Sequence, residues 1–125
     1  MSTQPSIFDS WPWPDSLDAL VAAPKHHSLV LENEYVRVVH THIPPGDLVP
    51  VHTHRWPSVA HTLQGSDFIR RDDRGNVLFD SRQAAVRPPA IQWLGPLPPH
   101  TVENVGANEI SLLIVEIKSS SADRK

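Results

Sequence analysis

The stretch PGDLVPVHTHRWPSVAHTLQG, residues 45–65, combines strand-forming residues with a concentration of histidines. His52 and His54 are two residues apart, and side chains at that spacing leave the same face of a β-strand. Two neutral imidazoles placed in this way can bind one cation, with metal–nitrogen bonds of about 2.0–2.1 Å. The spacing alone is weak evidence for a metal site, because His40 and His42 repeat it.

The rest of the chain also has the composition of short β-strands separated by turns. Proline inside a helix costs about 3 kcal/mol, so 13 prolines spread along 125 residues disfavour long helices. Runs rich in β-branched and apolar residues alternate instead with Gly, Pro and Asn. The expected strands are residues 35–43, 48–54, 58–64, a hairpin over 66–81 with its turn near Arg74-Gly75, 90–94, 100–105 and 110–117. They predict an all-β fold, an antiparallel sandwich or barrel with the jelly roll among the options.

One short helix is expected before these strands, over residues 16–23, capped by Asp15 and ended by Pro24. The apolar residues that precede it predict an N-terminal segment that packs on the domain or on a neighbouring subunit. The predicted organisation is an N-terminal arm with a short helix (1–34), a β-barrel (35–118) and a disordered tail (119–125).

The composition excludes several classes of protein. The chain has no cysteine, and therefore no disulfide, thiolate metal site or cysteine nucleophile. The formal charge is -3 with both signs interspersed, which argues against a nucleic-acid partner. Apolar runs such as residues 112–115 are far too short to cross a bilayer, and the N-terminus lacks the pattern of a signal peptide. The expectation is a single-domain cytoplasmic protein with no membrane partner.

The histidine pair is part of a longer sequence pattern, which also contains two glycines, a third histidine and an asparagine. The pair lies between Gly46 and Gly65, and His100 opens a later strand. This pattern resembles the two motifs of the cupin superfamily, G-x5-H-x-H-x3,4-E-x6-G and a second motif that ends in H-x3-N. The matching residues are Gly46, His52, His54 and Gly65 in the first motif and His100 and Asn104 in the second.

The resemblance extends from about Tyr35 to Ile117 and implies a double-stranded β-helix, the jelly-roll barrel of cupins. It implies that His52, His54 and His100 point into the mouth of the barrel and hold one divalent transition metal, Fe, Mn, Ni, Cu or Zn. It also implies association of the chain as a homodimer.

The sequence departs from the first motif where the motif has its glutamate. That position falls at Ser58, which supplies no carboxylate. The pattern looks like the variant in thiol dioxygenases and certain diketone-cleaving dioxygenases, in which three histidines hold iron. Three neutral imidazoles leave a divalent ion with its full +2 charge, which favours anionic chelating ligands.

Three further residues are candidates for the wall of a ligand pocket. Ser58 leaves space for a substrate oxygen or a water, and Trp56 follows the histidine pair closely enough to wall the pocket. Gln92 lies on the strand before the second motif, where an inward amide needs hydrogen-bond partners.

The remaining histidines are interpreted separately. His61 is an alternative ligand if a bulge near Pro57 reverses the alternation of its strand, which otherwise points it away from the pocket. The others are interpreted as exposed after the helix (His26 and His27) or as structural or outward-facing (His40 and His42).

Three functions are compatible with these residues. The first is a mononuclear metal-dependent enzyme, dioxygenase-like or a lyase or isomerase, acting on a small anionic metabolite. The second is a cupin that binds a small molecule without catalysis, and the third is a degenerate cupin scaffold used for association. No general base stands out in the sequence, and the fold does not decide between the three.

Overall fold

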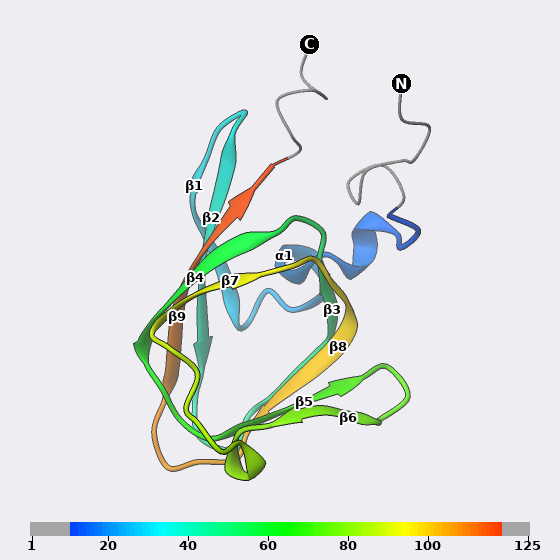
Figure 1. Ribbon diagram of the computed structural model, residues 1–125. Coiled ribbons are helices and arrows are strands. Elements are labelled where there is room, and N and C mark those ends of the chain that lie inside the picture. Colours follow the sequence, from blue (N-terminus) through cyan, green and yellow to red (C-terminus); the bar gives the residue numbers. More distant parts are fainter. Residues whose placement is uncertain (1–10, 119–125) are drawn as a thin grey trace, which may run out of the picture.

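Two antiparallel sheets curve around a common interior in the computed structural model, which describes residues 11–118 (Figure 1). Within the described residues the larger sheet has five strands in the order β1-β2-β9-β4-β7, and the smaller has four in the order β3-β8-β5-β6. The strands are β1 His27–Glu32, β2 Val36–Ile43, β3 Leu48–His54, β4 Ser58–Gln64, β5 Phe68–Asp72, β6 Val77–Asp80, β7 Ile91–Leu94, β8 Leu97–Asn104 and β9 Ile110–Ile117.

The predicted all-β architecture is confirmed, and two strands near the histidine pair have the predicted bounds. β3 and β4 begin and end at the expected residues, because proline and glycine flank each of them. The β5–β6 hairpin turns at Gly75, whose φ of +89° is a conformation that suits glycine. The predicted tail and the first ten residues of the N-terminal arm lie outside the described residues.

The barrel begins earlier than the predicted boundary at residue 35. β1 lies within the predicted arm and pairs antiparallel with β2, so it belongs to the five-stranded sheet. Its side chains are exposed after His27, and this edge strand has no alternating buried face. The alternation that identifies other strands in the sequence is therefore absent from β1.

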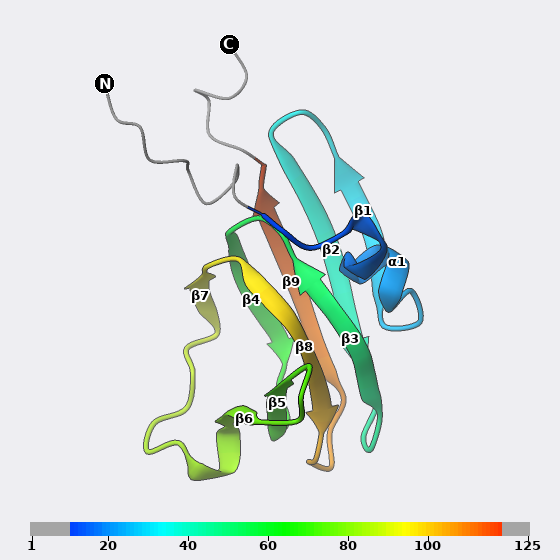
Figure 2. The same ribbon diagram turned by 90° about the vertical axis from the view of Figure 1, so that its right-hand side faces the viewer.

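The predicted helix over residues 16–23 is wrong in its extent. A 3-10 turn at Asp15–Leu17 is followed by the short helix α1, Ala19–Ala22, which packs against β1 and β3 (Figure 2). Asp18 separates the two because its backbone is extended (ψ 141°). Its carboxylate, and not that of Asp15, caps α1 by accepting from Leu20 N at 3.1 Å. None of the described helices is long and apolar enough to span a membrane.

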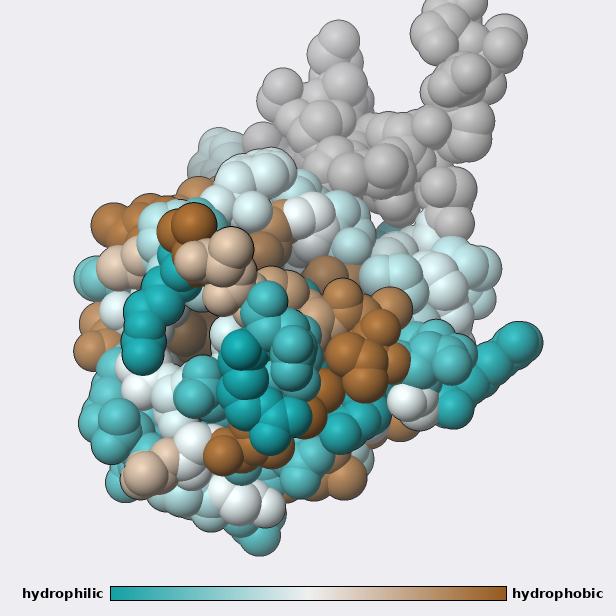
Figure 3. Space-filling model, turned by 60° about the horizontal axis from the view of Figure 1, so that its bottom comes forward, coloured by the Kyte–Doolittle hydropathy of each residue, from teal (hydrophilic) through white to brown (hydrophobic). Residues whose placement is uncertain are grey.

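The interior of the barrel is partly filled and partly open. Ala23, Ile43, Val49 and Ile110 form a buried apolar cluster between the sheets. The last three of these also line a cavity of about 630 Å³, a volume typical of small-molecule sites. The β5–β6 hairpin and the segment that follows it contribute to the wall, and Figure 3 shows hydrophilic and hydrophobic side chains intermixed on that side of the molecule.

Candidate metal centre

Four buried histidine rings meet at the wall of this cavity. His52 and His54 lie on β3, His100 lies on β8 and His27 begins β1. The ring of His52 is central, with centroids 4.3 Å from His100, 5.0 Å from His54 and 4.9 Å from His27. The pairing of β3 with β8 places His52 directly opposite His100. The structure therefore brings the rings of the three predicted ligands close to one another and adds His27. The histidines whose ligand atoms all lie within 4.8 Å of one another are His27, His52 and His54.

The interpretation of His26 and His27 as exposed residues is wrong. His27 is 5 % exposed, and one of its ring nitrogens lies within 4.8 Å of a ring nitrogen of His52 and of His54. His26 is also buried, with Nε2 at 3.1 Å from the carboxylate of Asp47. No spacing in the sequence indicates this role for His27, because it reaches the site from the connection between α1 and β1 and not from the strand of the motif.

Each of the four rings has its Nδ1 atom in a hydrogen bond to an oxygen. The acceptors are Pro50 O for His52 (2.7 Å), Pro98 O for His100 (2.7 Å), Ala23 O for His27 (3.0 Å) and Glu116 Oε2 for His54 (3.2 Å). Carbonyl and carboxylate oxygens accept only, so Nδ1 carries the hydrogen in every ring. The Nε2 atom of a neutral imidazole is then left with its lone pair, the form that binds a metal.

The environment keeps three of the four rings neutral. Burial, together with the charge of the neighbouring His54, lowers the pKa of His27 to about 4 and that of His100 to about 3. Burial, and then the neighbouring His54 and His100, lowers the pKa of His52 still further. These three imidazoles are uncharged at neutral pH, which is the state required of a metal ligand.

A carboxylate is present behind His54, although the motif position itself is Ser58. Glu116 lies on β9 directly opposite Ser58 on β4 and is completely buried. One of its oxygens accepts from His54 Nδ1, and the other accepts from Arg37 Nε at 2.5 Å. Both oxygens are therefore engaged, and Glu116 holds the ring of His54 in its orientation.

Arg37 and Asp18 continue this chain of contacts to the N-terminal segment. The two terminal nitrogens of Arg37 donate to the carboxylate of Asp18 at 2.7 and 3.0 Å. Burial alone would lower the pKa of Arg37, but the hydrogen bonds to Asp18 and Glu116 raise it above its ordinary value. Two carboxylates and one guanidinium leave a net charge of -1 beside the histidines, which favours a cation there.

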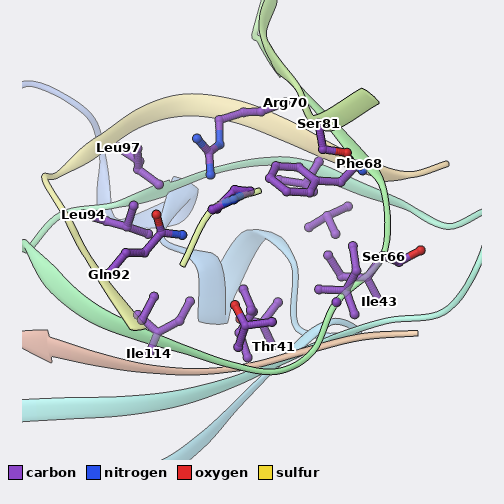
Figure 4. A pocket seen from close by; sticks show the side chains of 18 of the residues that line it. Thr41, Ile43, Ser66, Phe68, Arg70, Ser81, Gln92, Leu94, Leu97 and Ile114 are labelled. Carbon is purple, nitrogen blue, oxygen red and sulfur yellow. Dashed lines mark hydrogen bonds between the residues drawn. The ribbon is translucent and has the colours of Figure 1, made fainter. Parts of the chain in front are cut away.

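The predicted pocket residues divide into two groups. Ser58 and Gln92 line the cavity, with Ser58 buried and Gln92 pointing inward from β7 (Figure 4). Trp56 does not line it, and this prediction is wrong. β3 ends at His54, and Trp56 instead lies beside Arg37, whose guanidinium carbon is 5.0 Å from the centroid of its ring, next to a separate smaller cavity.

The other histidines lie away from the cavity. His61 is exposed on the face of β4 opposite to that of Ser58, so it does not face the four rings. His40 contacts Ser111 Oγ at 2.8 Å, and His42 is exposed beside Glu109.

Arg70 is a cavity residue that the sequence analysis missed. It lies on β5, and its side chain points into the cavity beside the ring of Phe68 (Figure 4). Its neighbours in the sequence are charged residues of a hairpin, which is a pattern typical of a solvated surface. Only the pairing of β5 with β8 shows that Arg70 lies on the inner face, opposite Val102.

Comparisons with known proteins identify the fold. No protein-family model and no curated protein matches the chain. Among solved structures, a cupin domain from Bordetella pertussis Tohama I has a TM-score of 0.59 and 22% identity over 74% of this chain and 92% of its own. An RmlC-like cupin family protein with a double-stranded β-helix fold from Methanocaldococcus jannaschii has a TM-score of 0.55 and 11% identity, covering 81% and 88%.

A third similar structure is that of the polyketide cyclase RemF from Streptomyces resistomycificus, with a TM-score of 0.53 and 17% identity over 78% of this chain and 68% of that chain. These similarities agree with the two antiparallel sheets and with the motif histidines that face the interior. The chain therefore has the double-stranded β-helix fold of the cupin superfamily.

Proposed function

We propose that this protein is a mononuclear metal-dependent enzyme that acts on a small anionic metabolite. His52, His54 and His100 would hold the ion, and His27 would take a fourth position. The observation that carries the proposal is the set of four buried imidazoles, each with Nδ1 bound to an oxygen and Nε2 left free.

The residues present fit a divalent transition metal. Imidazole nitrogen suits Zn, Cu, Fe and Ni, and the cluster is buried beside a cavity that a small molecule can enter. A bound ion supplies Lewis-acid or oxygen-binding chemistry at this place. The outer-shell acceptors hold each ring in a fixed orientation, so the ligand geometry exists before an ion binds.

The charge of the site supports an anionic substrate. Four neutral imidazoles leave a divalent ion with its full charge, because the oxygens of Glu116 are engaged by His54 and Arg37. An anion that binds the ion would replace the motif carboxylate that this chain lacks at Ser58. The proposal includes oxygenation, lyase and isomerase reactions. The polyketide cyclase RemF is an enzyme of similar fold.

Metal analysis of the purified protein tests this proposal. We expect about one transition-metal ion per chain, and its loss in the His52→Ala/His54→Ala double variant. The matched control is His40→Ala/His42→Ala, which removes two histidines of the same spacing from β2 and should leave the metal content unchanged. Absence of metal from the unaltered protein, even after reconstitution, would favour a non-catalytic binding protein or a degenerate scaffold.

Association as a homodimer stays a prediction. Size-exclusion chromatography with light scattering of the full chain should give twice the mass of one chain, 13.9 kDa. Deletion of residues 1–14 should reduce it to one chain, because the apolar N-terminal segment is the expected contact. A monomer in both cases would contradict the prediction.

A further inference from the structure

Arg70 is a half-buried cation that forms no ion pair with the described residues. Its Nε atom is buried and has no hydrogen-bond partner among residues 11–118. Its guanidinium carbon lies 5.8 Å from the centroid of the aromatic ring of Phe68. Arg71, the next residue, differs: it donates to Glu103 at 2.8 Å and is part of an ion pair.

An unpaired charge in this position is unfavourable for the protein alone. Burial of a charged group costs free energy unless hydrogen bonds or an opposite charge compensate it. Burial lowers the pKa of Arg70 below its ordinary value, yet a guanidinium stays protonated in proteins. The charge is therefore available to a ligand in the cavity.

The other charged residues of the cavity wall reinforce this positive potential. Among the described residues that line it, the side chains charged at neutral pH are three arginines, Arg70, Arg82 and Arg87, and one aspartate, Asp67. Asp67 accepts from Ser81 Oγ at 2.8 Å, and Arg82 is paired with Asp80. Arg70 is thus the inner cation of a cavity with an excess of positive charge.

Arg70 lies close to the candidate metal centre. It is opposite Val102 on β8, two residues from His100, and alternate residues of a strand share a face about 7 Å apart. After burial and His54, the charge of Arg70 also contributes to the lowered pKa of His100. One small molecule can therefore contact the guanidinium and the histidine cluster together.

We propose that Arg70 binds one carboxylate of a small dicarboxylic acid whose other carboxylate binds the ion held by the histidines. The inference rests on the proposed metal centre and adds the chemical class of the substrate. A guanidinium can form two parallel hydrogen bonds with a carboxylate, which fixes the orientation of the acid as well as its position. Gln92, on another wall of the cavity, faces the same space with its amide (Figure 4).

Binding of malonate and of its monoamide, malonamate, to the Co²⁺-loaded protein tests this inference. Both probes keep one carboxylate for the ion, but only malonate has a second one for Arg70. We expect Arg70→Met to weaken malonate binding by about ten-fold or more and malonamate binding by less than about two-fold. Arg70→Lys should give an intermediate loss, because it keeps the charge without the two-pronged geometry. Arg71→Met on the same strand should change neither.

Affinities are measured by titration of the visible absorption of the bound Co²⁺, and metal content is measured separately for each variant. Equal affinity for both probes in the unaltered protein, or equal loss of both in Arg70→Met, would overturn the role of Arg70. Failure of the unaltered protein to bind Co²⁺ would instead overturn the proposed metal centre, so the two failures are distinguishable.

Discussion

Replacement of Glu116 by leucine is expected to lower the free energy of unfolding by about 3 kcal/mol or more. Glu116 is completely buried and accepts hydrogen bonds from both Arg37 and His54. Leucine preserves much of the volume but leaves Arg37 Nε and His54 Nδ1 without their acceptors. Arg37 keeps its contacts with Asp18. We therefore expect a loss of unfolding free energy near the lower end of the range for breaking a buried ion pair.

Urea denaturation of the metal-free protein measures this effect without a contribution from bound metal. Glu116→Gln should lose less than Glu116→Leu, because the amide oxygen still accepts one hydrogen bond. The control is Glu103→Leu, which breaks a partly exposed pair with Arg71 and should cost less than about 1 kcal/mol. Equal losses in Glu116→Leu and Glu103→Leu would show that the buried network contributes no special stability.

The second large effect is expected from His27→Ala, which should weaken metal binding by at least about 10–100-fold. Loss of an outer-shell partner already costs that much, and His27 is proposed to contact the ion itself. The reason is geometric: one of its ring nitrogens lies within 4.8 Å of a ring nitrogen of His52 and of His54, and Nδ1 is held by Ala23 O.

Competition of the protein with a chromophoric chelator for Zn²⁺ gives the affinity of each variant. His61→Ala is the control, because His61 is exposed on β4 and should have no effect. Unchanged affinity in His27→Ala would mean that three histidines hold the ion and that His27 only packs against them. A circular dichroism spectrum of each variant shows whether the barrel is intact.

The sequence was sufficient to predict the parts of the site that lie on regular strands. His52 and His54 alternate on one strand with clear turn signals at both ends, so their shared direction follows from local geometry. The place of His100 came from the resemblance to cupin motifs, since only the fold puts β8 beside β3. β3 ends at His54, so the geometry of that strand does not predict the direction of Trp56. Trp56 lies beside the separate smaller cavity and not in the wall of the main one.

The missed residues share a different property: their roles depend on contacts between distant segments. Glu116 reaches His54 across 62 residues, and Arg37 reaches Glu116 across 79. Arg70 is hydrophilic and sits among charged residues, so its inward direction depends on strand register. Hydrophobic periodicity cannot predict that a charged side chain points inward, because the position of such a side chain depends on its partners and not on its own hydropathy.

The position of β9 has a consequence for the synthesis of the protein. It is the last of the described strands along the chain, yet it lies in the middle of the larger sheet and pairs with both β2 and β4. On the ribosome, β2 and β4 therefore leave the exit tunnel with open edges that no earlier strand closes. Such edges invite aggregation until residues 110–117 emerge and insert between them. Closure of the barrel, and with it the orientation of His54 by Glu116, is thus an event that follows translation of all the other described strands.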